Sequence, residues 1–297
     1  MKRLLFIYNP QAGKGLVRQK LSAILDVFTQ NGYLATACPT QKPGDGALRA
    51  AALGEKFPRV VCCGGDGTLS DVVTGLLALE KPPILGYIPA GTTNDFSRNL
   101  SLPRGMEKTA AVAVTGVPFP CDMGKFNDKN FVYVAAFGAF TEVAYGTPQG
   151  FKNLFGHLAY LMEGVKSLGA IRSHRLTVSY DGAEMEGDFI FGMVSNTVSV
   201  GGFQGLPADQ VRLDDGVFEV VLIRQPGTLQ ELNAILSALA TGSAAGANGI
   251  VEAFHAKSLT FSGDEELPWT LDGEYGGSPQ SVTIENLPHA ITIIKGK

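Results

Sequence analysis

Apolar runs alternate with segments of helical period along the first part of the chain, and this order constrains the fold more than any other feature. The apolar runs are 4–8, 33–38, 60–63 and 84–88, and the helical segments are 17–28, 47–56, 68–79 and 105–115. The run 60–63 has no polar face, which is typical of a strand buried on both sides in a parallel sheet. The alternation predicts a doubly wound, mostly parallel α/β domain whose ligands bind at the carboxyl ends of the strands.

After about residue 122 the pattern changes to short strands separated by Gly, Asp and Pro. The expected strands are 174–180, 188–194, 216–223, 257–261, 280–284 and 290–294. Segments of helical period at 151–168 and 228–241 interrupt them. The chain of 297 residues is about twice the length of a common domain. We therefore predict an α/β domain over 1–122 and an antiparallel β-sandwich over 123–297, with the C-terminal end packing back on the first domain.

Composition excludes several classes of protein. A formal net charge of -4 argues against nucleic acid as a partner, because a phosphate-binding footprint needs clustered Lys and Arg. The four cysteines form no CxxC pair, and Cys62 and Cys63 stand in an apolar run, so these two are expected to be buried reduced thiols of a cytoplasmic protein. The first apolar run is too short for a signal sequence, and no apolar stretch reaches the ~18 residues of a membrane span. The apolar stripe of 151–168 is better explained by core packing than by membrane binding, so any membrane contact is expected to be peripheral.

Three glycine-rich segments stand where a predicted strand gives way to a helix. The first, 9–15, resembles a Walker A loop but fails as one, because Tyr8 occupies the first glycine position and no Ser or Thr follows Lys14. It remains either an anion-binding turn or an ordinary connection between strand and helix.

The second segment is Gly64-Gly-Asp-Gly-Thr68, and the third is Gly91-Thr-Thr-Asn-Asp-Phe96. Glycines let the backbone approach a ligand, and Thr68 is expected to cap the helix that follows. Asp66 and Asp95 would then stand at neighbouring strand ends. Carboxylates beside phosphates repel them unless Mg²⁺ intervenes, so a phosphate site here predicts the metal as well.

These motifs together resemble the diacylglycerol kinase catalytic domain family, which includes bacterial soluble lipid kinases and their sphingosine and ceramide kinase relatives. The second segment alone is similar to NAD kinases and phosphofructokinases, whereas the third separates the family from them. Leu213-Asp-Asp-Gly216 and Leu271-Asp-Gly-Glu274 extend the resemblance in order over nearly the whole chain. The fold that it implies, a nucleotide-binding α/β domain followed by a β-sandwich, with the active site between them, agrees with the pattern of the sequence.

The resemblance also implies roles for individual residues. It places contacts to ATP at Asn9, Pro10, Gln11, Ala12, Gly13, Thr40, Gly64, Gly65, Asp66, Gly67, Thr68, Leu69, Ser70 and Thr92. Asp66, Asp95 and Asp122 would form the acidic side of the cleft that carries Mg²⁺. This chain departs from the family at Ser70-Asp71, where the family usually has Asn-Glu, so the contact at Ser70 is the weaker expectation.

The last two motifs would carry a second metal ion and the proton acceptor. By resemblance, a structural Mg²⁺ is held by the carboxylate of Asp215 and the backbone carbonyls of Arg212 and Val217; the residues alone predict a hairpin turn there. The resemblance makes Glu274 the general base. Asp272 is the rival base, or else forms the turn and orients Glu274.

We therefore expect an ATP- and Mg²⁺-dependent lipid kinase that phosphorylates the hydroxyl of diacylglycerol or a related lipid at the membrane surface. Residues 1–122 would bind the nucleotide and 123–297 the lipid, and the oligomeric state stays open, with a homodimer among the alternatives. The alternative functions are an NAD kinase-like or other small-alcohol kinase of the same superfold, and a catalytically silent nucleotide-binding regulator. A silent regulator would be expected to have lost Glu274 or the glycines of 64–67, and both are present.

Overall fold

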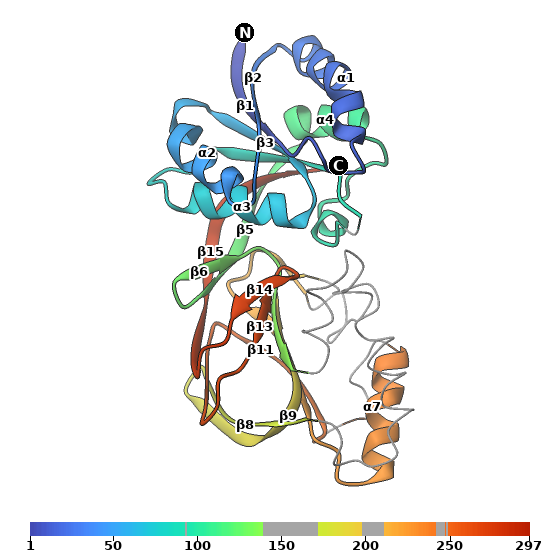
Figure 1. Ribbon diagram of the computed structural model, residues 1–297, viewed down its shortest axis with the longest axis vertical. Helices are drawn as coiled ribbons and strands as arrows, with labels where there is room; N and C mark the ends of the chain where they lie inside the picture. Colours follow the sequence, from blue (N-terminus) through green and yellow to red (C-terminus); the bar gives the residue numbers. More distant parts are fainter. Residues whose placement is uncertain (93, 139–171, 198–210, 242–246, 248) are drawn as a thin grey trace. The chain divides into compact units, whose positions relative to one another are not determined.

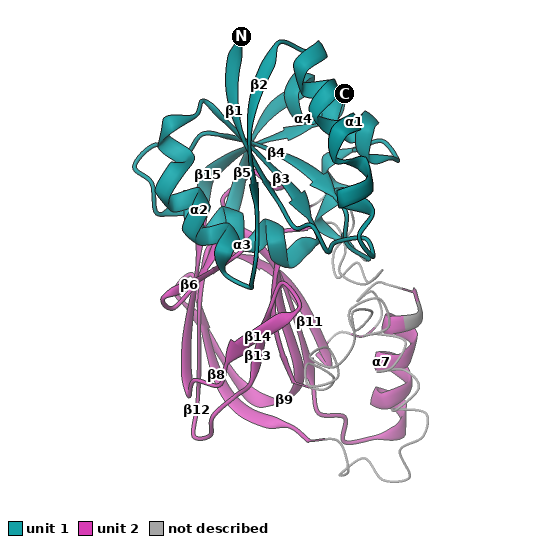
Figure 2. Ribbon diagram, turned by 45° about the horizontal axis from the view of Figure 1, so that its top comes forward, with its two compact units in different colours: residues 1–123, 288–297 teal, residues 124–287 magenta. Residues whose placement is uncertain are grey.

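The computed structural model describes residues 1–92, 94–138, 172–197, 211–241, 247 and 249–297. The chain divides into two compact units, Met1–Met123 with Pro288–Lys297, and Gly124–Leu287 (Figure 2). The expected helix 151–168 lies outside the described residues. Of the helices in the described part, none is long and apolar enough to cross a bilayer.

The sheet of unit 1 is parallel, as its apolar runs predicted. Its strands are β1 (Lys2–Tyr8), β2 (Tyr33–Pro39), β3 (Arg59–Gly64), β4 (Ile84–Pro89) and the end of β15 (Ser281–Lys295). They lie in the order β15-β4-β3-β1-β2, and each adjacent pair is parallel (Figure 1). Ile293 of β15 lies beside Leu85 of β4, so the last residues of the chain complete this sheet.

Helices cover both faces of the unit 1 sheet. They are α1 (Leu16–Gln30), α2 (Asp45–Leu53), α3 (Asp66–Leu77) and α4 (Met106–Thr115), with short 3₁₀ helices at Gly54–Lys56 and Phe96–Leu100. Figure 2 shows α1 and α4 on one side of the strands and α2 and α3 on the other. Phe6 of β1 packs in a buried cluster with Phe28 of α1 and Ala110 of α4. The predicted doubly wound arrangement is confirmed.

Unit 2 is an antiparallel β-sandwich. Its elements are β5 (Val117–Phe126, which begins in unit 1), β6 (Lys129–Phe131), β7 (Val134–Gly138), β8 (His174–Tyr180), β9 (Ala183–Ser195), β10 (Phe218–Arg224), α7 (Leu229–Thr241), β11 (Val251–Ala256), β12 (Ser258–Gly263), β13 (Trp269–Leu271) and β14 (Glu274–Gly277). The strands form antiparallel ladders in the order β14-β13-β7-β9-β8-β12-β15, with β10 between β9 and β11. The predicted sandwich is confirmed.

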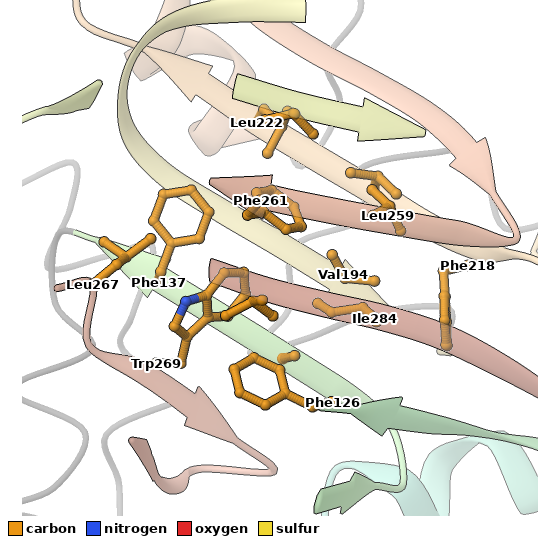
Figure 3. Close-up of a cluster of buried hydrophobic side chains, with 14 of the residues drawn as sticks. Phe126, Phe137, Val194, Phe218, Leu222, Leu259, Phe261, Leu267, Trp269 and Ile284 are labelled. Carbon is orange, nitrogen blue, oxygen red and sulfur yellow. The ribbon is translucent and has the colours of Figure 1, made fainter. Parts of the chain in front are cut away.

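Aromatic side chains fill the core of unit 2 around Trp269 of β13 (Figure 3). The centroid of its ring lies 4.8 Å from that of Phe137, 5.1 Å from that of Phe261 and 5.2 Å from that of Phe126. Buried aromatic pairs at such distances add specific ring contacts to the burial of apolar area. β13 is thereby fixed immediately before the Asp-Gly-Glu motif.

The segments 280–284 and 290–294 were predicted as two strands, and this was wrong: they belong to the single strand β15. Pro288 suggested a break, because proline cannot donate to a ladder. In the structure the strand changes partner there instead, from β12 at Ser281–Glu285 to β4 at Ile293. Near the change, His289 has a positive φ of 53° and donates its backbone N–H to Asp122.

Candidate active site

The glycine-rich segments follow three strands that are neighbours in the unit 1 sheet, so their backbones meet at its carboxyl edge. The N–H of Asn9 donates to the carbonyl of Cys63 over 2.9 Å, and the N–H of Ala90 donates to that of Gly64 over 2.8 Å. Thr40 joins the same edge, because its N–H donates to the carbonyl of Tyr8 over 2.9 Å. The structure therefore brings together the segments containing Asn9–Gly13, Thr40, Gly64–Ser70 and Thr92.

Two of the glycines are required by close backbone packing. A Cβ on Gly91 would lie 2.6 Å from the Cα of Gly65, and a Cβ on Gly64 would lie 2.5 Å from the Cβ of Thr68. Real Cβ atoms do not approach other atoms so closely, so a side chain at either position would push the segments apart. The expected cap at Thr68 was wrong: α3 begins at Asp66, with Gly65 as N-cap and no side-chain cap.

Asp66 and Asp95 lie next to each other. The backbone N–H of Asp95 donates to the Oδ2 of Asp66 over 3.1 Å. Asp95 is 1% exposed, and the Nε of Arg98 lies 3.8 Å from its Oδ1. Asp66 is half-buried rather than fully accessible. Carboxylate oxygens at the N-terminus of a helix that would bind phosphate are a suitable donor set for a hard cation such as Mg²⁺.

A tyrosine that sequence reasoning missed supports this pair of loops. The hydroxyl of Tyr87, on β4, donates to the carbonyl of Gly64 over 3.2 Å. Asn94, with a positive φ of 51°, closes the second loop by accepting the N–H of Gly91 over 2.8 Å and donating to its carbonyl over 2.7 Å. Tyr87 is the one polar side chain in the apolar run 84–88, which is the signal that could have identified it.

Asp122 lies on β5 of unit 1 and is fully buried. Its Oδ1 accepts the backbone N–H of His289 over 2.7 Å. This bond ties β5 to β15 where β15 changes partner.

Asp272 and Glu274 lie in unit 2, at the tight turn between β13 and β14. Asp272 and Gly273 have φ values of 50° and 89°, which is typical of a two-residue hairpin turn. The carboxylate of Asp272 is 5% exposed and accepts backbone N–H groups over 2.7, 3.0 and 3.2 Å from Val132, Tyr133 and Val134 respectively. Glu274 is exposed. The two carboxylates thus have different environments: one braces a turn and the other is accessible.

The residues of the expected second metal site form the turn before β10. The N–H of Val217 donates to the Oδ1 of Asp215 over 3.3 Å, and the Nδ2 of Asn286 donates to the carbonyl of Val217 over 3.2 Å. The Oδ1 of Asn286 is buried without a hydrogen-bond partner. The Nε of Arg212 donates to the Oδ1 of Asp214 over 3.4 Å. The backbone carbonyl of Arg212 is the oxygen that this residue could offer to a metal ion. Carboxylate, carbonyl and amide oxygens suit Mg²⁺.

Clustered acidic or thiol side chains would not have revealed either site. Among the described residues, no group of three or more His, Cys, Asp or Glu is placed to hold a metal ion.

Burial raises the pKa of the Cys63 thiol to about 12 and raises the pKa of Cys62 as well. The two thiols beside the glycine loop are therefore protonated and take no part as nucleophiles.

Comparison with known proteins agrees with this fold. Residues 3–126 match the diacylglycerol kinase catalytic domain, and residues 138–295 match the YegS C-terminal NAD kinase beta sandwich-like domain. The chain is 36% identical to the diacylglycerol kinase of Bacillus subtilis (strain 168) over 93% of this chain and 91% of that protein. The chain belongs to the diacylglycerol kinase family. The diacylglycerol kinase of Staphylococcus carnosus is also 36% identical, over 93% of this chain and 90% of its own length.

Solved structures of the family share the fold. A crystal structure of a diacylglycerol kinase from Bacillus anthracis is 25% identical and superposes with a TM-score of 0.77, covering 99% of this chain and 97% of the other. A second structure from that organism, at 24% identity and a TM-score of 0.83, covers 99% and 98% and shows the fold alone. Membership places the chain among the lipid kinases, for which ATP is the expected phosphate donor.

Proposed function

We propose that the chain is an Mg²⁺-dependent kinase that transfers the γ-phosphoryl group of ATP to the free hydroxyl of diacylglycerol or a related lipid at a membrane surface. The observation that carries the proposal is the pairing of Asp66 with Asp95 between two interlocked glycine loops, in a chain of the diacylglycerol kinase family. Unit 1 would bind the nucleotide and unit 2 the lipid.

The backbone of unit 1 would bind the phosphates of ATP. The N-terminus of α3 presents N–H groups that have no partner within the helix, and such groups favour an anion. The loops 9–13 and 64–70, with Thr40 and Thr92, would surround the nucleotide. The contact at Ser70 would be the weakest of these, because serine is shorter than the asparagine that is usual in the family. Tyr87 and Asn94 would fix the positions of the loops at Gly64 and Gly91.

Asp66 and Asp95, which lie next to each other, would hold Mg²⁺ near the phosphates, and the family resemblance adds Asp122 to them. When bound, the metal supplies positive charge that offsets the charge on the transferring phosphoryl group. The carboxylates make the phosphate site dependent on that charge, because alone they would repel ATP. Asp215, with the carbonyls of Arg212 and Val217, would hold a second, structural ion in unit 2. The buried Oδ1 of Asn286, which has no hydrogen-bond partner, supports the proposal that a cation binds there.

Glu274 would accept the proton of the lipid hydroxyl. A hydroxyl is a poor nucleophile at neutral pH, so phosphoryl transfer needs a positioned proton acceptor. Glu274 is accessible, whereas the Asp272 carboxylate is occupied by three backbone donors. Asp272 therefore suits the orienting role and Glu274 the catalytic one.

Radiolabelled ATP tests the proposal directly. The purified protein is incubated with Mg²⁺, [γ-³²P]ATP and a panel of diacylglycerol, monoacylglycerol, sphingosine, undecaprenol and phosphatidylglycerol in mixed micelles, with NAD in a parallel reaction. Label should enter the organic phase with diacylglycerol or a close relative. Transfer to NAD alone would instead indicate the NAD kinase-like alternative, and ATP binding without transfer to any acceptor would indicate a silent regulator.

A further inference from the structure

Asp71 of α3 caps the N-terminus of the neighbouring helix α2. Its Oδ2 accepts the backbone N–H of Gly44 over 2.9 Å, and the N–H of Gly46 donates to the same carboxylate. Gly44 is the N-cap residue of α2 and has a φ of 82°. The first N–H groups of a helix have no partner within it, and a carboxylate from another element can satisfy them. Asp71 therefore links α3 to the loop that precedes α2.

The two helices approach closely at this point because of two glycines. A Cβ on Gly46 would lie 2.8 Å from the Cβ of Asp71, and a Cβ on Gly75 would collide with the carbonyl of Ala47. The absence of a side chain at Gly46 lets the carboxylate of Asp71 reach the backbone of α2 directly.

The surroundings of the Asp71 carboxylate disfavour its charge. Burial raises the pKa of Asp71, and the nearby charge of Asp45 raises it further, while the two N–H bonds act in the opposite direction. Asp45 itself accepts the N–H of Gln41 over 2.8 Å and has an Arg49 nitrogen 3.9 Å away. Of these influences, the two N–H groups of α2 are the ones that favour the charged form of Asp71.

The segments that Asp71 joins are both part of the proposed nucleotide site. The loop 40–44 begins at Thr40, which is hydrogen-bonded to the end of β1. Asp71 directly follows Ser70, the last residue of the proposed phosphate-binding segment. The Thr40 loop is thus anchored at one end to β1 and at the other to α3, one residue beyond the glycine loop.

We propose that Asp71 is a positioning residue for the nucleotide: by capping α2 from α3, it fixes the distance between the Thr40 loop and the glycine loop. The proposal rests on the proposed nucleotide site and is independent of which lipid is the acceptor. It assigns Asp71 no contact with the reacting atoms.

The test compares Asp71→Asn with wild type and with Asp26→Asn, which removes one negative charge from the exposed face of α1. The amide of asparagine keeps one acceptor but turns a donor toward the second backbone N–H. Binding of Mg²⁺-ATP, measured by calorimetry without lipid, should weaken about tenfold in Asp71→Asn, as loss of a charge-assisted hydrogen bond does. The KM for ATP should rise to the same extent, with kcat within about twofold of wild type. Asp26→Asn should match wild type.

A second variant approaches the same contact from the other side. Gly46→Ala would push α2 away from Asp71 while leaving the carboxylate in place. It should raise the KM for ATP as Asp71→Asn does, and both variants should show faster hydrogen exchange over 41–47. If Asp71→Asn fails to fold, Gly46→Ala still decides the outcome.

Wild-type affinity for ATP in a folded variant with faster exchange over 41–47 would overturn the proposal. So would a lowered melting temperature with an equal loss of kcat at unchanged KM, which would indicate a purely structural role. Wild-type protein that binds Mg²⁺-ATP but phosphorylates no lipid would contradict the proposed function. The calorimetric comparison would still decide the role of Asp71 in that case.

Discussion

The backbone N–H of Asp95 donates to the Oδ2 of Asp66 over 3.1 Å, so the loops that follow β3 and β4 are joined through the carboxylate that we expect to bind Mg²⁺. Asp66 thus has two tasks. One oxygen fixes the second loop, and the rest of the carboxylate can face a cation.

Asp66→Asn should lose at least about 10²-fold in kcat while remaining folded. The amide keeps an oxygen for the Asp95 N–H but loses the charge that the metal needs. Steady-state kinetics over a range of Mg²⁺ concentrations would measure the loss, and circular dichroism would confirm the fold. An unchanged kcat with an unchanged Mg²⁺ requirement would rule out this metal role.

Glu274→Gln should reduce kcat by about 10²-fold or more and leave ATP affinity and melting temperature near those of wild type. Glutamine has the same shape but cannot accept the proton of the hydroxyl. Single-turnover kinetics with saturating Mg²⁺-ATP would isolate the chemical step.

Asp272→Asn is the matched comparison for Glu274→Gln. Its amide would face three backbone donors with one oxygen, so we expect it to destabilise the protein by roughly 1–3 kcal/mol. Urea denaturation would measure that loss. A stable Asp272→Asn protein without activity, beside an active Glu274→Gln protein, would move the base to Asp272.

Asp215→Ala should abolish the rise in melting temperature that Mg²⁺ gives the nucleotide-free protein. A cation that binds the folded state alone stabilises it by mass action, and the effect disappears with its ligand. Differential scanning fluorimetry with and without Mg²⁺ measures this, and Asp214→Ala is the control from the same turn. A wild-type melting temperature that does not respond to Mg²⁺ would remove the second site.

Asp71→Asn should also change how stability depends on pH. The pKa of Asp71 is raised in the folded protein, so its contribution to stability is greatest below its ordinary value of 3.8 and is lost as pH rises through the raised value. Asparagine does not titrate, so Asp71→Asn does not lose stability in this way. The free energy of unfolding of Asp71→Asn minus that of wild type should therefore increase from about pH 4 upward and then level off. Urea denaturation at several pH values would show it; a constant difference between the proteins would contradict it.

The apolar strand β3 was readily predicted from the sequence, and the shortest strands were not. The run 60–63 is apolar throughout and lies within β3, whereas β6 and β13 have three residues each, too few for a period. β15 was predicted as two strands because proline usually interrupts a strand. The local sequence does not show that the strand continues through Pro288 and changes its partner there.

The proposed site shows the same limit. Glycine motifs indicated the loops at Gly64 and Gly91, since a ligand-binding backbone needs such residues. The contacts of Tyr87 with Gly64 and of Asp71 with Gly44 join residues 23 and 27 positions apart, and nothing in the local sequence specifies them. Asp66 and Asp95 were assigned to Mg²⁺ binding from their place in the glycine-rich segments, whereas the assignment of Glu274 as the base came from the family motif.

The course of β15 sets an order for biosynthesis. Unit 1 is made of the first 123 residues and the last ten, with all of unit 2 between them in the chain. The end of β15 that pairs with β4 therefore emerges from the ribosome roughly 10 to 40 s after β4, at the usual rate of translation. All residues of unit 2 are therefore made before unit 1 is complete, and one edge of β4 stays unpaired with β15 until the end of β15 has been made.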